Sequence, residues 1–233
     1  MLFISPPFGN YLNIDNSISI KGSFTLQPRE GLLFQIFKTL RYDFKNGGWR
    51  NKIGLRNPGI KYAIDKYYVK GNHSYGRIRK HGCPRVQYPC SIPIDSYKNY
   101  RMKHIISIAI LDKNEIEPLD EIVPRDCNIE LNVSCPNVND EKSKNHKEEV
   151  YKHLGVFYDE QRKWCIVKLS PLDNMTHVDL LYKQGFRQFH CSNTLPKRDG
   201  SGGLSGPILK QYSGPLIKSI KEKYPDTEII AGG

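Results

Sequence analysis

The sequence has no long hydrophobic run and no secretory leader. None of its apolar stretches approaches the roughly 18 to 20 residues that span a bilayer, and the longest, around 104–111, has the size of a strand. The first ten residues lack the basic region and the cleavage site of a signal peptide. We therefore expect no membrane span and a cytoplasmic location.

Cysteine is sparse and poorly spaced for metal binding. None of the six cysteines forms a C-x-x-C pair. Cys83 and Cys90 lie near His73 and His81, but their spacing matches no common zinc motif. Without a secretory signal, buried thiols are expected in place of a disulfide framework. The sequence therefore predicts no metal site.

Acidic residues are scarce in one part of the chain. The whole sequence carries a net charge of +11, and residues 56–103 hold eleven Lys and Arg, two acidic residues and seven of the fourteen tyrosines. Basic residues interleaved with aromatic ones can bind nucleic acid. A solvated basic insertion at about 70–103 accounts for the same composition, and we favour that interpretation over nucleic-acid binding.

Short apolar runs alternate with helical patterns along the whole chain. This β-α-β-α rhythm predicts a parallel sheet, either open and doubly wound or closed as a barrel. No G-x-G-x-x-G or G-x-x-x-x-G-K-[ST] motif follows the first strand, which argues against the nucleotide-binding open sheets. The expected strands are 1–5, 17–22, 104–110, 128–133, 164–169, 186–191 and 228–231, and the main helices 30–44, 141–157, 173–184 and 207–224.

Polar residues cluster just after the C-terminal ends of several expected strands, where (β/α)8 barrel enzymes build their sites. We therefore predict an α/β fold of the TIM (β/α)8-barrel type, as one domain over 1–233. Because the chain ends just after the seventh expected strand, we expect about seven of the eight strands and an incomplete C-terminal end.

The strand at 128–133 leads into a loop that holds two carboxamides and a thiol. Asn132 and Asn137 flank Cys135 there. Carboxamides both donate and accept hydrogen bonds, so they suit a planar ligand with alternating N–H and C=O groups, such as a pyrimidine. A cysteine at this place can serve as a base or a nucleophile. The structural alternative is an Asx-rich turn with a buried cysteine.

Other candidate residues follow the later strands. Lys168 stands in an apolar strand, where a buried ammonium requires an anionic or carbonyl partner. The Gly-rich segment 201–206 precedes an expected helix, and bare backbone amides at such a place suit a phosphate. Gly232 and Gly233 form a second candidate phosphate contact, and Asn51 adds another carboxamide.

Taken in order, these motifs resemble the dihydroorotate dehydrogenase family. Its members are FMN-containing (β/α)8 barrels that oxidise dihydroorotate to orotate in de novo pyrimidine biosynthesis. The resemblance is carried by Gly22-Ser23-Phe24-Thr25, Asn51 with Gly54-Leu55, Glu130-Leu131-Asn132-Val133-Ser134-Cys135-Pro136-Asn137, Lys168-Leu169-Ser170-Pro171, Ser192-Asn193-Thr194, Gly202-Gly203-Leu204-Ser205-Gly206 and Ala231-Gly232-Gly233.

The resemblance implies an oxidoreductase and a role for each matching residue. Cys135 would be the general base that takes the C5 proton of dihydroorotate while hydride passes from C6 to flavin N5. The implied substrate contacts are Asn51, Asn132, Asn137, Asn193 and Thr194. The implied flavin contacts are Ser23, Ser107, Asn132, Lys168 and Ser192, with Ser205, Gly206, Gly232 and Gly233 at the flavin phosphate.

The electron acceptor stays open at this stage. With a cysteine as the base, the chain resembles the class 1 enzymes of this family. Its Gly22-Ser23-x-Thr25 and G-G-L-S-G segments look more like those of the class 2 enzymes. Fumarate, an NAD-linked partner subunit and a quinone are the candidate acceptors, and class 1 relatives are usually homodimers. The alternatives are an FMN oxidoreductase for another dihydropyrimidine, or a truncated, non-catalytic barrel relative.

Two departures from the family pattern carry structural expectations. Lys21 is one residue away from the position of a class 1 lysine, and a shift of one residue turns a strand side chain to the other face. The family's N-P-x-P-R segment is replaced by residues 32–37, which read as helix.

Overall fold

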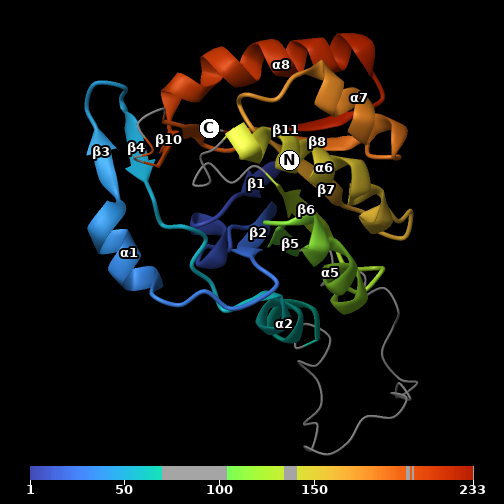
Figure 1. Cartoon of the computed structure of the whole chain (residues 1–233), viewed down its shortest axis with the longest axis horizontal. Helices are drawn as coiled ribbons and strands as arrows, with labels where there is room; N and C mark the ends of the chain where they lie inside the picture. Colours follow the sequence, from blue (N-terminus) through green and yellow to red (C-terminus); the bar gives the residue numbers. More distant parts are fainter. Residues whose placement is uncertain (70–103, 134–140, 198–199, 201, 233) are drawn as a thin grey trace, which may run out of the picture.

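The protein is built around a seven-stranded parallel sheet that curves into a nearly closed barrel (Figure 1). The computed structural model describes residues 1–69, 104–133, 141–197, 200 and 202–232. The expected basic insertion at 70–103 lies outside these residues, and the single domain stays a prediction. The strand order is β1-β2-β5-β6-β7-β8-β11, which confirms the predicted partial TIM-type barrel.

All seven strands expected from the sequence form within a few residues of their predicted ends. Each is short and rich in Ile, Val, Leu and Phe, as buried parallel strands are. They are β1 (Leu2–Ile4), β2 (Ser17–Phe24), β5 (His104–Ala109), β6 (Ile129–Asn132), β7 (Cys165–Leu169), β8 (Gln188–Cys191) and β11 (Glu228–Ala231).

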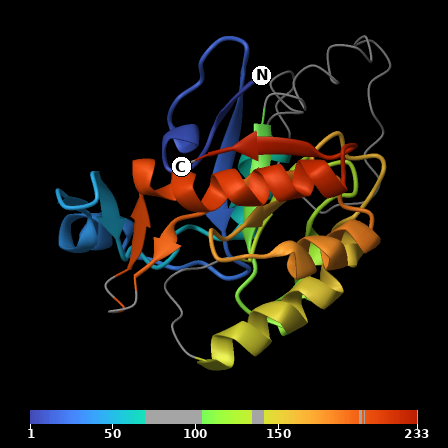
Figure 2. The same ribbon diagram turned by 90° about the horizontal axis from the view of Figure 1, so that it is seen from above.

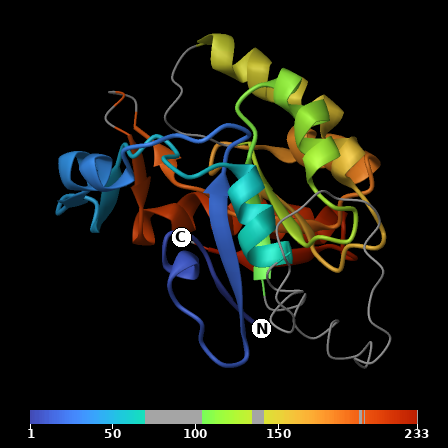
Figure 3. The same ribbon diagram turned by 90° about the horizontal axis from the view of Figure 1, so that it is seen from below.

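Helices cover the outer face of the sheet, as Figures 1 and 2 show, except the first of them, Leu32–Thr39, which lies beside the strand Gly48–Asn51. Local signals explain where they start and stop: the Asn174 side chain caps the start of α7, and Gly185, with φ of +103°, follows its end. Figure 3 shows α2 beside β2. The helices are α1 (Leu32–Thr39), α2 (Ile60–Ala63), α5 (Ile116–Ile122), α6 (Glu141–His153), α7 (Met175–Lys183) and α8 (Lys210–Lys223).

Alternation along the strands separates two hydrophobic clusters. The larger cluster lies between the sheet and the helices and includes Val167 and Phe189, both fully buried. The smaller cluster lies on the opposite face of the sheet, inside the barrel, and consists of Ile18, Ile20, Ile105, Trp164 and Ile166, with Phe3 and Ile230 packed against it. The neighbours Ile166 and Val167 thus face opposite sides of β7, as a period of two requires.

A second, antiparallel sheet corrects two predictions. It has the order β3-β4-β10-β9 and is formed by β3 (Arg41–Asp43), β4 (Gly48–Asn51), β9 (Leu195–Pro196) and β10 (Gly203–Ser205).

The predicted helix 30–44 is therefore too long. It begins only after Gly31, which has a φ of +88°, and it ends at Thr39 because Leu40 is extended and β3 then pairs with β4. The Gly-rich segment, expected as a loop, contributes β10. The expectation that residues 32–37 are helical is confirmed.

Lys21 lies on the outer face of β2, away from the barrel interior. Its Nζ donates to the Gly9 carbonyl oxygen at 2.6 Å and lies 5.8 Å from the centre of the Tyr67 ring, which packs against the outer cluster. Burial and the nearby Lys66 ammonium lower the pKa of Lys21. The predicted change of face is confirmed, because Ile20 next to it points inward. Within the described ranges, no helix is long and apolar enough to cross a membrane.

Truncating Ile166 tests the inner cluster as a source of stability. Ile166 has no exposed surface, so Ile166→Ala should lower the free energy of unfolding by about 2–5 kcal/mol, through lost burial and the cavity left behind. Leu33→Ala is the control, because Leu33 is 71% exposed and its truncation should cost less than about 0.5 kcal/mol. Urea denaturation of the three proteins measures both values, and equal losses would contradict the assignment.

Candidate functional site

A fully buried carboxylate stands at the centre of the barrel interior. Glu130, on β6, has no exposed surface. Its Oε1 accepts a hydrogen bond from Ser107 Oγ at 2.7 Å and lies 3.7 Å from Lys168 Nζ. Its Oε2 lies 2.6 Å from His190 Nδ1. The sequence required an anionic or carbonyl partner for the Lys168 ammonium, and the Glu130 carboxylate is such a partner. Four neighbouring strands supply the cluster.

The environment keeps this carboxylate ionised. Burial alone would raise the pKa of Glu130, but the Lys168 charge and the bonds from His190 and Ser107 lower it to about 2. Burial and the Lys168 charge lower the pKa of His190, against the attraction of Glu130. Because an ionised carboxylate only accepts hydrogen bonds, the His190 Nδ1 that lies against Glu130 carries a proton.

A directed chain of hydrogen bonds leads from two carboxamides to Glu130. Asn193 Nδ2 donates to Asn132 Oδ1 at 3.1 Å, and Asn132 Nδ2 donates to Ser23 Oγ at 2.9 Å. Ser23 Oγ lies 2.8 Å from Ser107 Oγ. The single proton of Ser107 goes to Glu130, so Ser23 must donate to Ser107. Four of the predicted site residues are thus brought together in one network.

The register of the sheet sets several of these residues in one row. Asn132 pairs with Lys168, Lys168 with His190, and His190 with Ile230 on β11. These strands are parallel, so the row lies near the C-terminal ends of β6, β7 and β8. The inward-facing Ile166 lies two residues before Lys168 on the same face of β7, so the polar row stands above the apolar inner cluster.

The ends of β8 and β11 are joined by backbone bonds. Ser192 N donates to the Gly232 carbonyl oxygen at 3.3 Å, and Gly232 N donates to the Cys191 carbonyl oxygen at 2.7 Å. Thr194 N donates to Asn193 Oδ1 at 2.8 Å, which fixes that carboxamide. The predicted residues Ser192, Thr194 and Gly232 therefore lie at the same end of the barrel as the network.

Two other predicted residues belong to the antiparallel sheet, and a third follows it directly. Asn51 ends β4 and pairs with Gly203 of β10, and Ser205 Oγ donates to the Trp49 carbonyl oxygen at 3.1 Å. Gly206 follows β10 with a φ of +117°. In the described part of the chain, no hydrogen bond joins these residues to the Asn132–Asn193 network. Their expected contacts with substrate and phosphate stay predictions.

Three predicted residues lie outside the described residues. They are the expected base Cys135, the carboxamide Asn137 and the expected phosphate contact Gly233. The cysteines that the structure does describe, Cys127, Cys165 and Cys191, are buried, as predicted for most thiols of this chain. Among the described side chains, no group of three or more His, Cys, Asp and Glu could hold a metal ion.

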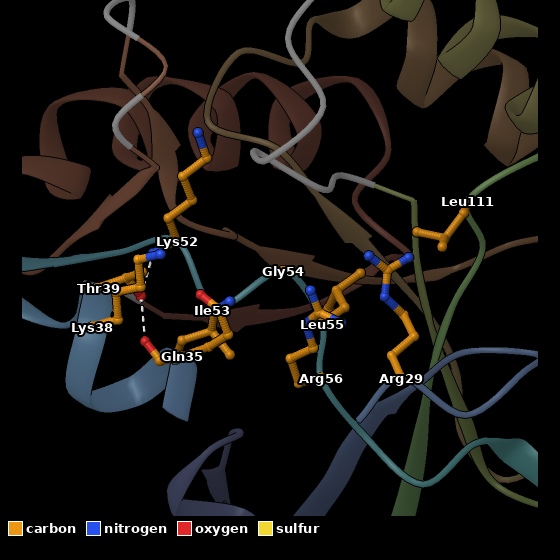
Figure 4. Close-up of a pocket in the computed structure, with 10 residues that line it drawn as sticks. All are labelled: Arg29, Gln35, Lys38, Thr39, Lys52, Ile53, Gly54, Leu55, Arg56 and Leu111. Atoms are coloured by element: carbon orange, nitrogen blue, oxygen red, sulfur yellow. Dashed lines mark hydrogen bonds between the residues drawn. The ribbon is translucent and has the colours of Figure 1, made fainter. Parts of the chain in front are cut away.

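A basic pocket of about 460 Å³ lies between α1 and the segment that follows β4 (Figure 4). Figure 4 shows Arg29 and Arg56 near Leu111, with Gln35 and Thr39 of α1 on the other side. The Nε atoms of both arginines are buried and have no hydrogen-bond partner among the described residues. The described lining contains four basic residues and no acidic one, and its positive charge favours an anion. The residues are Arg29, Gln35, Lys38, Thr39, Lys52, Ile53, Gly54, Leu55, Arg56 and Leu111.

A second buried carboxylate fixes the loop after Lys168. Asp173 accepts hydrogen bonds from Ser170 N at 2.6 Å and from the Tyr151 hydroxyl at 2.9 Å. It also forms an ion pair with Lys147. Burial would raise the pKa of Asp173, but the His177 ring, whose Nδ1 lies 3.0 Å from Asp173 Oδ1, and the Lys147 charge lower it. Asp173 therefore ties the loop after the C-terminal end of β7 to Lys147 and Tyr151 of α6.

Sequence reasoning assigned no role to Glu130, His190 or Asp173. A signal was present for the first two: each lies between two apolar residues of its own strand, so alternation within that strand could have placed its side chain on the opposite face from the helices, inside the barrel. For Asp173, which follows Pro171 in a loop, the sequence carried no comparable signal.

Comparison with known proteins gives a consistent picture. The family model described as dihydroorotate dehydrogenase matches residues 8–233. A similar protein from Thermotoga petrophila, the catalytic subunit of dihydroorotate dehydrogenase B (NAD(+)), is 25% identical over 259 residues, covering 100% of this chain and 84% of its own length. The corresponding subunit of Petrotoga mobilis is 28% identical over 235 residues, covering 93% and 67%, and that of Streptococcus pneumoniae is 27% identical over 246 residues, covering 95% and 68%.

Replacing Glu130 should change how stability depends on pH. The folded protein protonates Glu130 only near pH 2, whereas a free glutamate does so near its ordinary value of 4.5. The ionised Glu130 therefore contributes stability above pH 4.5 that is lost as the pH falls toward 2, by about 1–3 kcal/mol. Glu130→Gln lacks this contribution and should show a shallower loss.

Urea denaturation midpoints from pH 7 to pH 3 test this expectation. Glu121→Gln is the control, because Glu121 is exposed on α5 and its profile should follow that of the wild type. Parallel profiles for Glu130→Gln and the wild type would mean that Glu130 is not held ionised.

Proposed function

Because this chain belongs to the dihydroorotate dehydrogenase family, we propose that it oxidises dihydroorotate to orotate in de novo pyrimidine biosynthesis, with FMN as its cofactor. The observation that carries the proposal is the row of Asn132, Lys168 and His190 at the C-terminal edge of the barrel, joined to Asn193 by hydrogen bonds. This is the edge where barrel enzymes build their sites.

The donor set at this edge fits a flavin. Carboxamides, hydroxyls and one ammonium from neighbouring strands suit the alternating C=O and N–H groups of its pyrimidine edge. FMN supplies the acceptor for the hydride that leaves dihydroorotate. Lys168 would hold its pyrimidine edge, and Ser23, Ser107, Asn132 and Ser192 would contact the ring and its side chain. Ser205, Gly206, Gly232 and Gly233 would approach the phosphate through backbone amides.

Substrate binding is assigned to the carboxamides. Asn51, Asn132, Asn137 and Asn193, with Thr194, would hydrogen-bond the flat dihydropyrimidine ring and its carboxylate. Asn193 is already oriented by its bonds to Asn132 and to the Thr194 amide, so little side-chain freedom is lost on binding. The basic pocket beside Asn51 supports an anionic substrate, because its positive charge raises the local concentration of anions.

Cys135 is the proposed general base. Its Sγ, as the thiolate, would take the proton from C5 of dihydroorotate, which leaves the ring able to release hydride from C6. Cys135 stands three positions after Asn132, the last residue of the strand that also carries Glu130, and Asn132 is fixed by its hydrogen bond to Ser23.

The proposed acceptor is an NAD-linked partner subunit. The similar proteins from Thermotoga, Petrotoga and Streptococcus are each called the catalytic subunit of an NAD(+) enzyme, which implies a further subunit in those proteins. Fumarate and a quinone are the other acceptors to be tested, and a homodimer and a cytoplasmic location are part of the proposal.

The first experiment is to purify the protein, record its flavin absorption, and add dihydroorotate without air. The flavin band should bleach in the wild type. Cys135→Ser should keep its FMN but slow the bleaching by about 10²–10⁴-fold, the usual contribution of a general base. Cys127→Ser, which alters a buried thiol just before β6, is the control and should bleach at the wild-type rate.

Each other result points elsewhere. Bound FMN that dihydroorotate does not bleach would overturn the substrate and favour another dihydropyrimidine. A protein without flavin would indicate a non-catalytic relative. Unchanged bleaching in Cys135→Ser would exclude Cys135 as the base.

A further inference from the structure

Glu130 is assigned no contact with substrate or cofactor, but it contacts two side chains that are assigned to the flavin, Ser107 and Lys168. Lys168 Nζ lies 3.7 Å from Glu130 Oε1, and both side chains are at least nine-tenths buried. In a buried site, charges at this distance interact strongly because little water screens them. The positive charge that Lys168 can exert on a flavin is therefore reduced by the carboxylate behind it.

His190 acts on the same carboxylate from the other side. Its Nδ1–H donates to Glu130 Oε2 at 2.6 Å, and Lys168 faces Oε1. A hydrogen bond to an ionised carboxylate draws negative charge toward the donor. The shorter the bond from His190, the less of the Glu130 charge remains to compensate Lys168. The two partners thus compete for one carboxylate, and His190 is the neighbour of Lys168 in the same row.

We propose that Glu130 is a positioning residue that sets how much of the Lys168 charge reaches the bound flavin, and that His190 adjusts this through its hydrogen bond to Glu130. This inference rests on the proposed function, since it takes FMN as the ligand of the row. It assigns a role to two side chains that neither the family resemblance nor the sequence patterns had assigned.

The proposal makes two expectations of opposite sign for the reduction potential of the bound flavin. Glu130→Gln removes the compensating charge, so Lys168 should favour the reduced, more negative flavin by about tenfold, which is a rise of about 30 mV for a two-electron couple. His190→Phe removes the donor and leaves Glu130 to compensate Lys168 more fully, so the potential should fall. His190→Asn retains an N–H donor and should stay close to the wild type.

The experiment is a redox titration of FMN-loaded protein with a chemical reductant. Asp173→Asn is the matched control: Asp173 is the other buried carboxylate of this region, and its loss should lower stability without moving the potential. The variants are repeated in a Lys168→Gln background as a double-mutant cycle. If Glu130 acts through Lys168, the effect of Glu130→Gln should shrink there by more than half.

Three results would overturn the proposal: an unchanged potential in Glu130→Gln, shifts of the same sign in Glu130→Gln and His190→Phe, or an undiminished effect without Lys168. If Glu130→Gln does not fold, the fall expected for His190→Phe still decides the question. Failure of the proposed function is seen separately, because it would appear as absent flavin or as flavin that dihydroorotate does not reduce, whereas the titration uses a chemical reductant.

Discussion

The buried Glu130 carboxylate is the constraint on which the rest of the candidate site depends. A charge without solvent is tolerated only where partners replace its hydration. Here the partners are Ser107, Lys168 and His190, one from each of three other strands. A shift of any of these strands by one residue would turn its partner to the outer face and leave the charge unpaired. The carboxylate thus specifies the register of the sheet at the level where the site is built.

The barrel interior is divided into an apolar floor and a polar upper layer. Ile18, Ile20, Ile105 and Ile166 form the floor together with Trp164. The next inward positions of β5, β6 and β7 carry Ser107, Glu130 and Lys168, and the outward positions remain apolar and pack under the helices. Stability and chemistry are therefore separated along the strand axis, and the fold can place polar groups at one end without opening its core.

How far the sequence predicted this arrangement depends on the range of the interactions involved. The seven strands were predictable, because a short apolar run of strand length is a local property, and so was the outward direction of Lys21. The antiparallel sheet was not, because β10 and β4 are separated by about 150 residues and neither alternates clearly. The helix predicted at 30–44 failed for a different, local reason: Arg41–Asp43 pair with β4 across a short turn that brings Asp43 opposite Gly48, and this pairing outweighed the helical pattern there.

The sequence by itself determined the residue types of the site, the order of the strands that carry them, and the family to which they point. It also showed that Lys168 needed an anionic or carbonyl partner. Only the tertiary structure decided which partner that is, because Glu130 is separated from Lys168 by 38 positions and becomes its neighbour through the pairing of β6 with β7. The same holds for His190 and for the chain from Asn193 to Ser107: hydrogen bonds between strands depend on register and direction, which a linear pattern does not contain.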